Sequence, residues 1–252
     1  MFFDVTAIAH RGASGVLPEN TRHSFVKALD LGAQAIELDV QLTRDEVPVV
    51  IHDETLDRTT NGSGRVCDTD FTTIAELDAG SWFGASFQGV EIPTLEEVLR
   101  LIGGRALINI ELKPDAERVH TLVKHVVTTV ARLDCFDHVV FSSFERAALK
   151  RIRNLAPGAR LGVLCGADDV EDAISFARMV RVSNLHPHVR AVDSGLIETA
   201  HACGWRVWTW TANEPGEIAL LAAMGVDGIF TDYPDRVVQL NRACDKAAAP
   251  VS

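Results

Sequence analysis

The stretch AIELDV (residues 35–40) is a short apolar run with two carboxylates in it, and it predicts a β-strand. Side chains alternate along a strand, so Glu37 and Asp39 point to the same face and Leu38 points to the other. Similar short runs recur along the chain, with amphipathic segments between them. This pattern is typical of parallel strands joined by crossover helices.

Eight such runs are predicted to form parallel strands. They are Val5–Ala9, Ala35–Val40, Ala106–Ile110, His138–Phe141, Arg160–Leu164, Val182–Leu185, Arg206–Thr211 and Gly228–Phe230. An open doubly wound sheet usually has fewer strands and a G-x-G-x-x-G loop after the first, which Gly12 and Gly15 do not complete. The sequence therefore predicts an α/β fold, a (β/α)8 TIM barrel formed as a single domain by residues 1–252.

One segment interrupts the repeat. A ninth strand-like run, Val47–His52, can pair with Ala35–Val40 through a turn at Arg44–Glu46, and the residues after it are rich in Thr, Gly, Asp and Ser. We predict that residues 53–92 form a small inserted subdomain after the second strand. Insertions of this kind lie over the end of the barrel where barrel enzymes keep their active sites.

Composition excludes several classes of function. The chain of 252 residues has a formal charge of −11 and no cluster of Lys and Arg, which argues against nucleic acid as a partner. No signal-type segment is visible, and apolar runs fall far short of the roughly 20 residues of a membrane span. Five scattered cysteines without a C-x-x-C pair predict reduced thiols. We expect a cytoplasmic protein with no integral membrane association, and its oligomeric state is not predictable.

Three carboxylates are predicted to meet at the end of the barrel. Glu111 ends the strand run that follows Glu37 and Asp39 in the barrel. Any one of these residues alone would be expected to face water or an Arg or Lys side chain. Three at matching depths on neighbouring strands repel one another unless a cation neutralises them, and oxygen ligands suit Mg²⁺ or Ca²⁺.

Four further residues are candidates for catalysis and anion binding. His10 ends the first strand and His52 ends the extra strand, so both are predicted to reach the same rim and to serve as a general acid and a general base. Arg11 and Lys113 carry charges that suit a phosphoryl group. An alternative role for Arg11 and Lys113 is to balance the three carboxylates as ion pairs, and the two roles are compatible.

Two tryptophans and a histidine pair late in the chain give weaker indications of a functional site. Trp208 and Trp210 alternate onto one face of the seventh strand; Trp208 is predicted to be core, and Trp210 either core or an apolar contact for a substrate. His186-Pro187-His188 is interpreted as a loop that follows the sixth strand.

Taken together, these motifs resemble those of the glycerophosphodiester phosphodiesterase family. The matching segments, in the family's order, are His10-Arg11-Gly12, Pro18-Glu19-Asn20-Thr21, Glu37-Leu38-Asp39, His52-Asp53 with Thr55, Thr59-Thr60-Asn61-Gly62 with Gly64, Asn109-Ile110-Glu111-Leu112-Lys113, Ser142-Ser143-Phe144, Trp210-Thr211-Ala212-Asn213 and Thr231-Asp232-Tyr233-Pro234.

The resemblance implies a barrel enzyme that hydrolyses a small-molecule glycerophosphodiester to glycerol 3-phosphate and an alcohol. It implies that His10 and His52 are the acid/base pair, that Glu37, Asp39 and Glu111 bind the divalent cation, and that Arg11 and Lys113 contact the phosphate. Asn20 matches a position beside the metal, although locally it could equally be the N-cap of the next helix.

Three alternatives stay open at this point. A related phosphodiesterase of the lysophospholipase D or sphingomyelinase D type would need an apolar patch, for which Trp82, Phe83 and Phe87 of the insertion are candidates. A metal-dependent sugar isomerase or aldolase barrel also uses carboxylates with Lys or His, but it does not explain the ordered motifs. A barrel that binds without catalysis is disfavoured by the complete set of histidines and carboxylates.

Overall fold

The computed structural model describes residues 5–115 and 117–248 and has the predicted barrel architecture. Its parallel strands are β1 (Thr6–Ala9), β2 (Ala35–Leu42), β4 (Leu107–Leu112), β5 (Val139–Ser143), β6 (Arg160–Cys165), β7 (Asn184–Pro187), β8 (Arg206–Thr209) and β9 (Gly228–Thr231). Each strand pairs with its neighbours in the order β1-β9-β8-β7-β6-β5-β4-β2, and a pairing of β1 with β2 closes the barrel.

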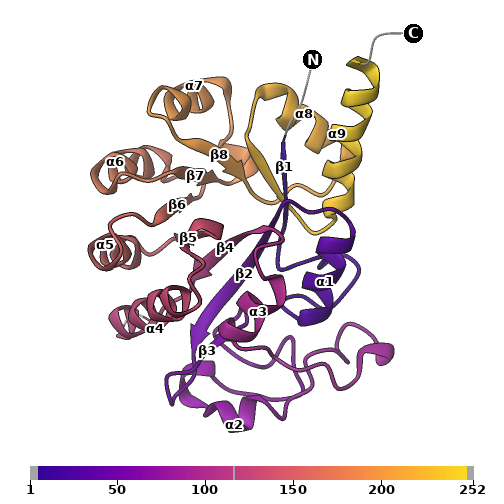
Figure 1. Ribbon diagram of the computed structural model, residues 1–252, viewed down its shortest axis with the longest axis vertical. Coiled ribbons are helices and arrows are strands. Elements are labelled where there is room, and N and C mark those ends of the chain that lie inside the picture. The colour runs from indigo at the N-terminus through magenta and orange to yellow at the C-terminus, as the bar shows by residue number, and fades with distance from the viewer. Residues whose placement is uncertain (1–4, 116, 249–252) are drawn as a thin grey trace.

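Helices connect the strands and cover the outside of the barrel (Figure 1). They are α1 (Arg22–Asp30), α3 (Leu95–Ile102), α4 (Val119–Arg132), α5 (Arg146–Leu155), α6 (Val170–Val180), α7 (Ser194–Ala202), α8 (Pro215–Met224) and α9 (Pro234–Ala248), with single turns η3 (Phe136–His138) and η4 (Val189–Ala191). A capping box of Thr94 and Glu97 opens α3, and Gly103 ends that helix in the left-handed conformation.

Strand alternation separates the core into two layers. One set of strand residues, including Ile36, Leu38 and Phe141, packs with the helices in the large outer cluster. A second set forms a cluster inside the barrel and comprises Ile8, Ala35, Val140, Trp208 and Phe230. Residues two positions further along each strand share the inward direction. The inward positions at the carboxyl ends of the strands are therefore available for a site.

The segment between β2 and α3 lies beside the barrel, at the lower end of Figure 1. Strand β3 (Pro48–Val50) pairs antiparallel with β2, as the sequence predicts, but it is shorter than the predicted run Val47–His52, so His52 lies two residues beyond the strand and not at its end. Residues 53–92 contain the short elements η1 (Val66–Asp68), α2 (Phe71–Ile74) and η2 (Ala85–Phe87). A small core of their own, shared with β3, is formed by Val49, Ile51, Leu56, Val66, Ile74, Ala79 and Ile92.

Several strand bounds need correction. Strands β2, β4 and β5 each end two residues later than predicted, at Leu42, Leu112 and Ser143. The sixth barrel strand spans Asn184–Pro187 rather than Val182–Leu185, so the interpretation of His186 and Pro187 as loop residues is wrong. His186 is fully buried, and room for its ring comes from the neighbouring strand, where a Cβ atom on Gly162 would lie 2.3 Å from His186 Cε1. The seventh strand ends at Thr209, two residues earlier than predicted.

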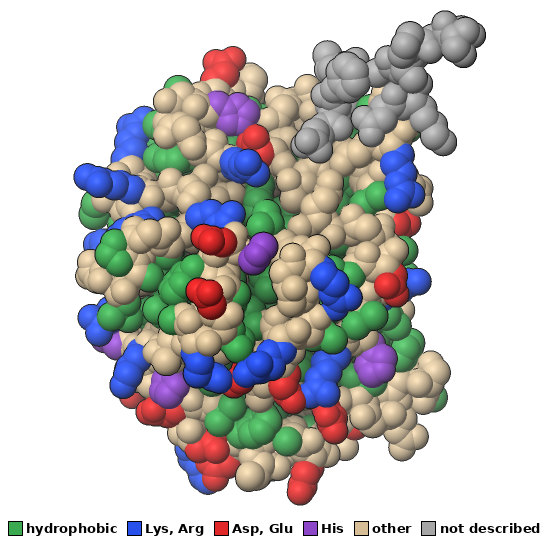
Figure 2. Space-filling view, in the orientation of Figure 1, with side chains coloured by type: hydrophobic (Ala, Val, Ile, Leu, Met, Phe, Trp, Pro, Cys, Tyr) green, Lys and Arg blue, Asp and Glu red, His purple; other side chains and the backbone are tan. Residues whose placement is uncertain are grey.

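The charge of the surface and the character of the helices can be compared with the expectations about nucleic acid and membranes. On the face drawn in Figure 2, acidic and basic side chains are interspersed, so this face offers no uniformly basic patch for a polyanion. Across residues 5–115 and 117–248, no helix has both the length and the apolar character that a membrane span requires. The five cysteines carry free thiols.

Candidate active site

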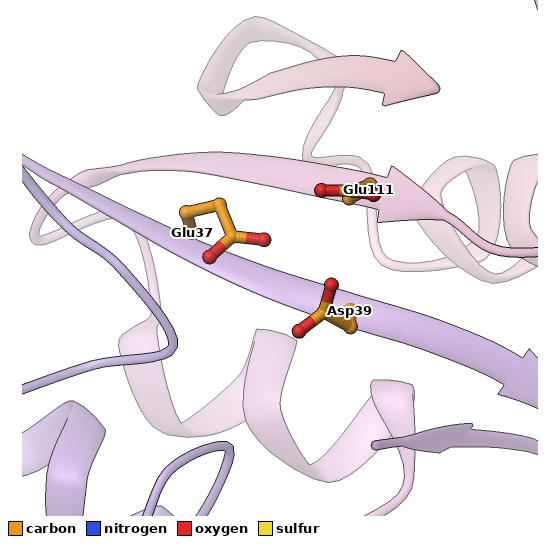
Figure 3. Close-up of side chains that lie close together, drawn as sticks. All are labelled: Glu37, Asp39 and Glu111. Carbon is orange, nitrogen blue, oxygen red and sulfur yellow. The ribbon is translucent and has the colours of Figure 1, made fainter. Parts of the chain in front are cut away.

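The three predicted carboxylates converge at the carboxyl ends of β2 and β4. Asp39 is the register partner of Glu111, and Glu37 lies two residues before Asp39 on the same face. One side-chain oxygen of each residue lies within 4.8 Å of those of the other two. Figure 3 shows the carboxylates of Glu37 and Asp39 on β2 facing the same space as Glu111 on β4. Local alternation and strand pairing together produce this cluster.

The cluster carries charge that the protein alone does not balance. Glu37 and Asp39 are almost completely buried, and within the described residues Glu37 Oε1 and Asp39 Oδ1 have no hydrogen-bond partner. Burial, together with repulsion from Asp39 and Glu111, raises the pKa of Glu37 well above its usual value. Burial and Asp39 also raise the pKa of Glu111. Buried, unpartnered carboxylate oxygens of this kind fit a hard divalent cation.

Two basic residues offset part of this charge. Lys113 Nζ lies 2.7 Å from Glu111 Oε1 and 3.4 Å from Asp39 Oδ1, and Arg11 Nε lies 3.2 Å from Asp39 Oδ2 without hydrogen-bond geometry. Burial opposes ionisation of Asp39, but the charges of Lys113 and Arg11 outweigh it and lower the pKa of that carboxyl group. The ion-pair role predicted for Arg11 and Lys113 is therefore present in the structure.

The loop after β1 depends on its glycine. The Arg11 backbone N–H donates to Glu37 Oε2 at 2.9 Å, so this loop touches the carboxylate cluster. Gly12 follows with φ of +83°, and a Cβ atom there would lie 2.4 Å from Ser24 Oγ. Any other residue would be strained and would clash with α1, so Gly12 holds the loop close to the site.

Asn20 lies beside the cluster, as the resemblance implies, and not at a helix cap. Its Nδ2 donates to Asp39 Oδ2 at 2.8 Å, and its Oδ1 accepts from the Asp39 backbone N–H at 3.3 Å. Thr21 is the N-cap of α1, with Ser24 completing a capping box. The capping alternative for Asn20 is therefore wrong, and the residue orients Asp39 instead.

His10 is held by an aspartate from the other end of the chain. His10 Nδ1 lies 2.7 Å from Asp232 Oδ1, and Asp232 also accepts from Ser14 Oγ and Asn213 Nδ2. Burial opposes ionisation of Asp232, but the hydrogen bond from His10 outweighs it, and its pKa falls to about 2. Because an ionised carboxylate only accepts, His10 Nδ1 carries the proton and Nε2 is left to exchange a proton with a ligand.

His52 is held by its neighbour in sequence. His52 Nδ1 lies 2.6 Å from Asp53 Oδ1, and Arg58 donates to both oxygens of Asp53 at 2.7 and 3.0 Å. The same Arg58 guanidinium donates to both oxygens of Glu19, which in turn pairs with Arg11 at 2.9 Å. Burial lowers the pKa of His52 below its ordinary value. Arg58, which belongs to the insertion, thus contacts both Asp53, which holds His52, and Glu19, which pairs with Arg11.

Seven of the nine predicted site residues line one small cavity of about 80 Å³. Its lining includes His10, His52, Arg11, Glu37, Glu111, Lys113 and Trp210, while Asp39 and Asn20 lie outside its lining. Trp210 donates from Nε1 to the His186 carbonyl at 2.8 Å and packs edge-on against Phe144. Trp208 is buried inside the barrel as predicted. The two histidines, the basic residues Arg11 and Lys113, and two of the three carboxylates thus face the same space.

Sequence reasoning assigned no role in the site to three residues of this region. Asp232 lies two positions after Phe230, which points into the barrel, so strand alternation predicts that Asp232 points inward too. It directly follows Thr231, the register partner of Ala9, so barrel closure places it beside His10. Asp53 directly follows His52, but adjacency alone does not show a contact. His186 has the same inward direction as Trp208 and stacks on it at 5.4 Å between ring centroids.

The insertion aromatics do not line this cavity. Trp82, Phe83 and Phe87 pack edge-on against one another at 5.6 Å between successive ring centroids. A larger cavity of about 410 Å³ lies instead between the barrel and residues 53–67, and shares His52 and Glu111 with the small one. The predicted apolar patch for an acyl chain therefore lies away from the small cavity.

Known proteins of similar sequence belong to one family. A model of the glycerophosphoryl diester phosphodiesterase family matches residues 10–236. A glycerophosphodiester phosphodiesterase of Caldanaerobacter subterraneus subsp. tengcongensis is 40% identical over 236 residues, covering 93% of this chain and 97% of that protein. One of Bacillus altitudinis is 38% identical over 236 residues, covering 92% and 96%.

A solved structure shows the same fold. An Oleispira antarctica phosphodiesterase in complex with the product sn-glycerol-3-phosphate matches with a TM-score of 0.87 at 32% identity, covering 94% of this chain and 96% of that one. The family model spans most of the chain, including every residue of the site described above. The chain belongs to the glycerophosphoryl diester phosphodiesterase family.

Proposed function

We propose that this protein hydrolyses glycerophosphodiesters to glycerol 3-phosphate and an alcohol, with His10 and His52 as the acid/base pair. Glu37, Asp39 and Glu111 would hold a divalent cation, Mg²⁺ or Ca²⁺. The observation that carries the proposal is the shared cavity, in which two aspartate-oriented histidines face a carboxylate cluster with unpartnered oxygens. Family membership supports the same activity.

The residues of the chain divide the work of the reaction. One histidine takes a proton from the attacking hydroxyl as its oxygen bonds to phosphorus, and the other gives a proton to the alcohol oxygen as its bond to phosphorus breaks. The attacking hydroxyl belongs to water or to the substrate's own glycerol, in which case a cyclic phosphate forms first and water then opens it. A transient cyclic phosphate in ³¹P NMR distinguishes the two routes.

The charged residues stabilise the phosphoryl group. Arg11 and Lys113 line the cavity and are suited to bind phosphoryl oxygens, but both now face the carboxylates. A bound divalent cation supplies charge that offsets both the carboxylates and the negative charge developing at phosphorus. With the carboxylates neutralised, Arg11 and Lys113 would be available to bind the phosphoryl oxygens of the substrate. Trp210 provides an apolar surface for the glycerol carbons.

The test is an assay of glycerophosphocholine hydrolysis by the purified protein. We expect EDTA to abolish the release of glycerol 3-phosphate, and added Mg²⁺ or Ca²⁺ to restore it. His10→Ala and His52→Ala should each lower kcat by roughly 10²- to 10⁴-fold. The matched control is His201→Ala, because His201 also pairs with an aspartate, Asp227, at 2.8 Å but stands at the opposite end of the barrel strands.

Near-normal turnover in both active-site variants would contradict the acid/base roles. Activity that is indifferent to EDTA and to added cations would contradict the cation site. Lysophosphatidylcholine is assayed in parallel. A preference for it over glycerophosphocholine would show that the substrate is a lysophospholipid and not a deacylated glycerophosphodiester.

A further inference from the structure

The larger cavity has no role in the chemistry described so far. It has a volume of about 410 Å³ and lies between residues 53–67 and the loops that follow β4 and β5. It meets the small cavity at His52, Glu111, Lys113 and Phe144. A volume in this range is typical of sites that enclose a small organic group.

The two cavities suit different halves of a phosphodiester. The small one alone is lined by His10, Arg11 and Glu37, and its volume is about 80 Å³. Glycerol 3-phosphate is the half that every glycerophosphodiester shares, so it belongs in the small cavity beside the carboxylates. The alcohol differs between substrates and would extend past His52 into the larger cavity.

Charge in the larger cavity is predominantly negative. Its lining has five carboxylates and three Lys or Arg side chains. Three carboxylates are engaged: Asp53 with Arg58, Glu111 with Lys113, and Asp115 with Arg65. Arg118 has no carboxylate partner among the described residues and donates to the carbonyls of Thr43 and Cys67 at 2.9 and 3.4 Å.

Two carboxylates of the lining remain available to a ligand. The carboxylate groups of Glu54 and Glu145 form no ion pair or hydrogen bond with another described residue, and only the backbone N–H of Glu145 donates to a side chain, Ser143 Oγ, at 3.0 Å. Glu145 is the N-cap residue of α5, yet its side chain makes no capping bond. Glu54 and Glu145 come from different segments of the chain, one from the insertion and one from the loop after β5. They can therefore approach a cationic group from two sides.

An aromatic ring and aliphatic side chains complete the lining. Phe144 is 44% exposed and is held edge-on by Trp210 at 5.6 Å between ring centroids. Leu42, Leu112 and Leu122 form apolar wall around the same space. An exposed aromatic ring near carboxylates is a common arrangement for binding an alkylammonium group, whose weakly hydrated charge tolerates apolar contacts.

We propose that the larger cavity binds the leaving alcohol and selects amino alcohols of the choline and ethanolamine type through Glu54, Glu145 and the ring of Phe144. This inference rests on the proposed glycerophosphodiesterase activity and adds the class of alcohol that the site prefers.

The experiment compares kcat/KM for glycerophosphocholine and glycerophosphoglycerol, which present the same scissile bond with a cationic and a neutral alcohol. We expect the wild-type protein to favour glycerophosphocholine. In the double variant Glu54→Gln/Glu145→Gln, the ratio of the two kcat/KM values should fall by roughly 3- to 10-fold, as expected for two exposed charges. Phe144→Leu, which keeps an apolar side chain but removes the ring, should lower the same ratio by roughly 2- to 5-fold. Glu198→Gln, at an exposed position of α7, is the control and should leave the ratio unchanged.

A second measurement uses only the wild-type protein. Added NaCl should reduce the ratio, because salt screens exposed charges and the neutral alcohol has none. A ratio of one in the wild type, or a ratio that neither salt nor the double variant changes, would overturn the inference while leaving the phosphodiesterase activity intact. Failure to hydrolyse either substrate would instead contradict the proposed function itself.

Discussion

His10 Nδ1 and Asp232 Oδ1 lie 2.7 Å apart although 222 positions separate them in the chain. Closure of the barrel brings them together, because β1 and β9 pair with Ala9 opposite Thr231 and each residue directly follows its strand. A histidine and a carboxylate that orients it thus come from the first and last strands of the barrel.

Replacing Asp232 by Asn should lower kcat with little change in KM. The variant keeps the size of the side chain but removes the charge that orients the His10 ring. A hydrogen bond to a charged group contributes roughly 1.5–3 kcal/mol, equivalent to about 10- to 100-fold in rate. Steady-state kinetics measure this, with Asp227→Asn as the control from the His201 pair. Equal losses in the two variants would show that Asp232 is merely structural.

Arg58 should matter for catalysis although it lines neither cavity. It donates to Asp53 and to Glu19, which support His52 and Arg11. Arg58→Gln should lower kcat/KM by roughly 10-fold, and Arg58→Lys should restore part of it, because lysine keeps the charge but not the planar fork.

The control for Arg58 is Arg44→Gln, which breaks another arginine–aspartate pair at the insertion, that with Asp70. An Arg58→Gln enzyme with wild-type kinetics, or one no worse than Arg44→Gln, would refute the positioning role.

Glu37→Gln should stabilise the metal-free protein while abolishing activity. Since the folded state raises the pKa of Glu37, the folded chain holds a proton that the unfolded chain has lost, so stability falls as pH rises from 4.5 through the folded-state pKa. The Glu37→Gln variant has no carboxylate at this position, so it does not lose this stability as pH rises. Thermal unfolding in EDTA at pH 8 should therefore give a higher Tm for the variant.

Adding the cation should reverse this order, so that the wild type has a higher Tm than the Glu37→Gln variant. At 100 times Kd, Mg²⁺ or Ca²⁺ would stabilise the wild type by about 2.7 kcal/mol, or roughly 5–10 °C in Tm, and the variant by much less. Equal shifts in the two proteins would place the cation elsewhere.

Acid should destabilise the protein through His186. Complete burial lowers the pKa of His186 to about 3, against 6.5 for the unfolded chain. Between pH 6.5 and about 3 the unfolded state binds a proton that the folded state does not, so stability is full above pH 6.5 and falls with pH by up to about 1.4 kcal/mol per unit.

His186→Gln removes the titrating group from this pH range. Urea unfolding at pH 7, 6, 5 and 4 should show a shallower loss for the variant than for the wild type, even if the variant is less stable at pH 7. Parallel curves for the two proteins would contradict the assignment to His186.

Local pattern predicted most of this molecule. Alternation along AIELDV predicted that Glu37 and Asp39 share a face, and eight apolar runs with helical segments between them predicted the closed barrel, because both follow from the periods of strand and helix. The ends of strands likewise predicted that His10 and Glu111 lie near the same rim.

Tertiary structure decided the contacts between distant segments. Asn20 orients Asp39 instead of capping α1, Asp232 orients His10, and Arg58 joins the supports of His52 and Arg11. The burial of His186 required Gly162 on the neighbouring strand to leave space for its ring. Periodicity specifies the direction of each side chain, but the partner it meets depends on strand register, barrel closure and the placement of the insertion, which arise only when the whole chain packs.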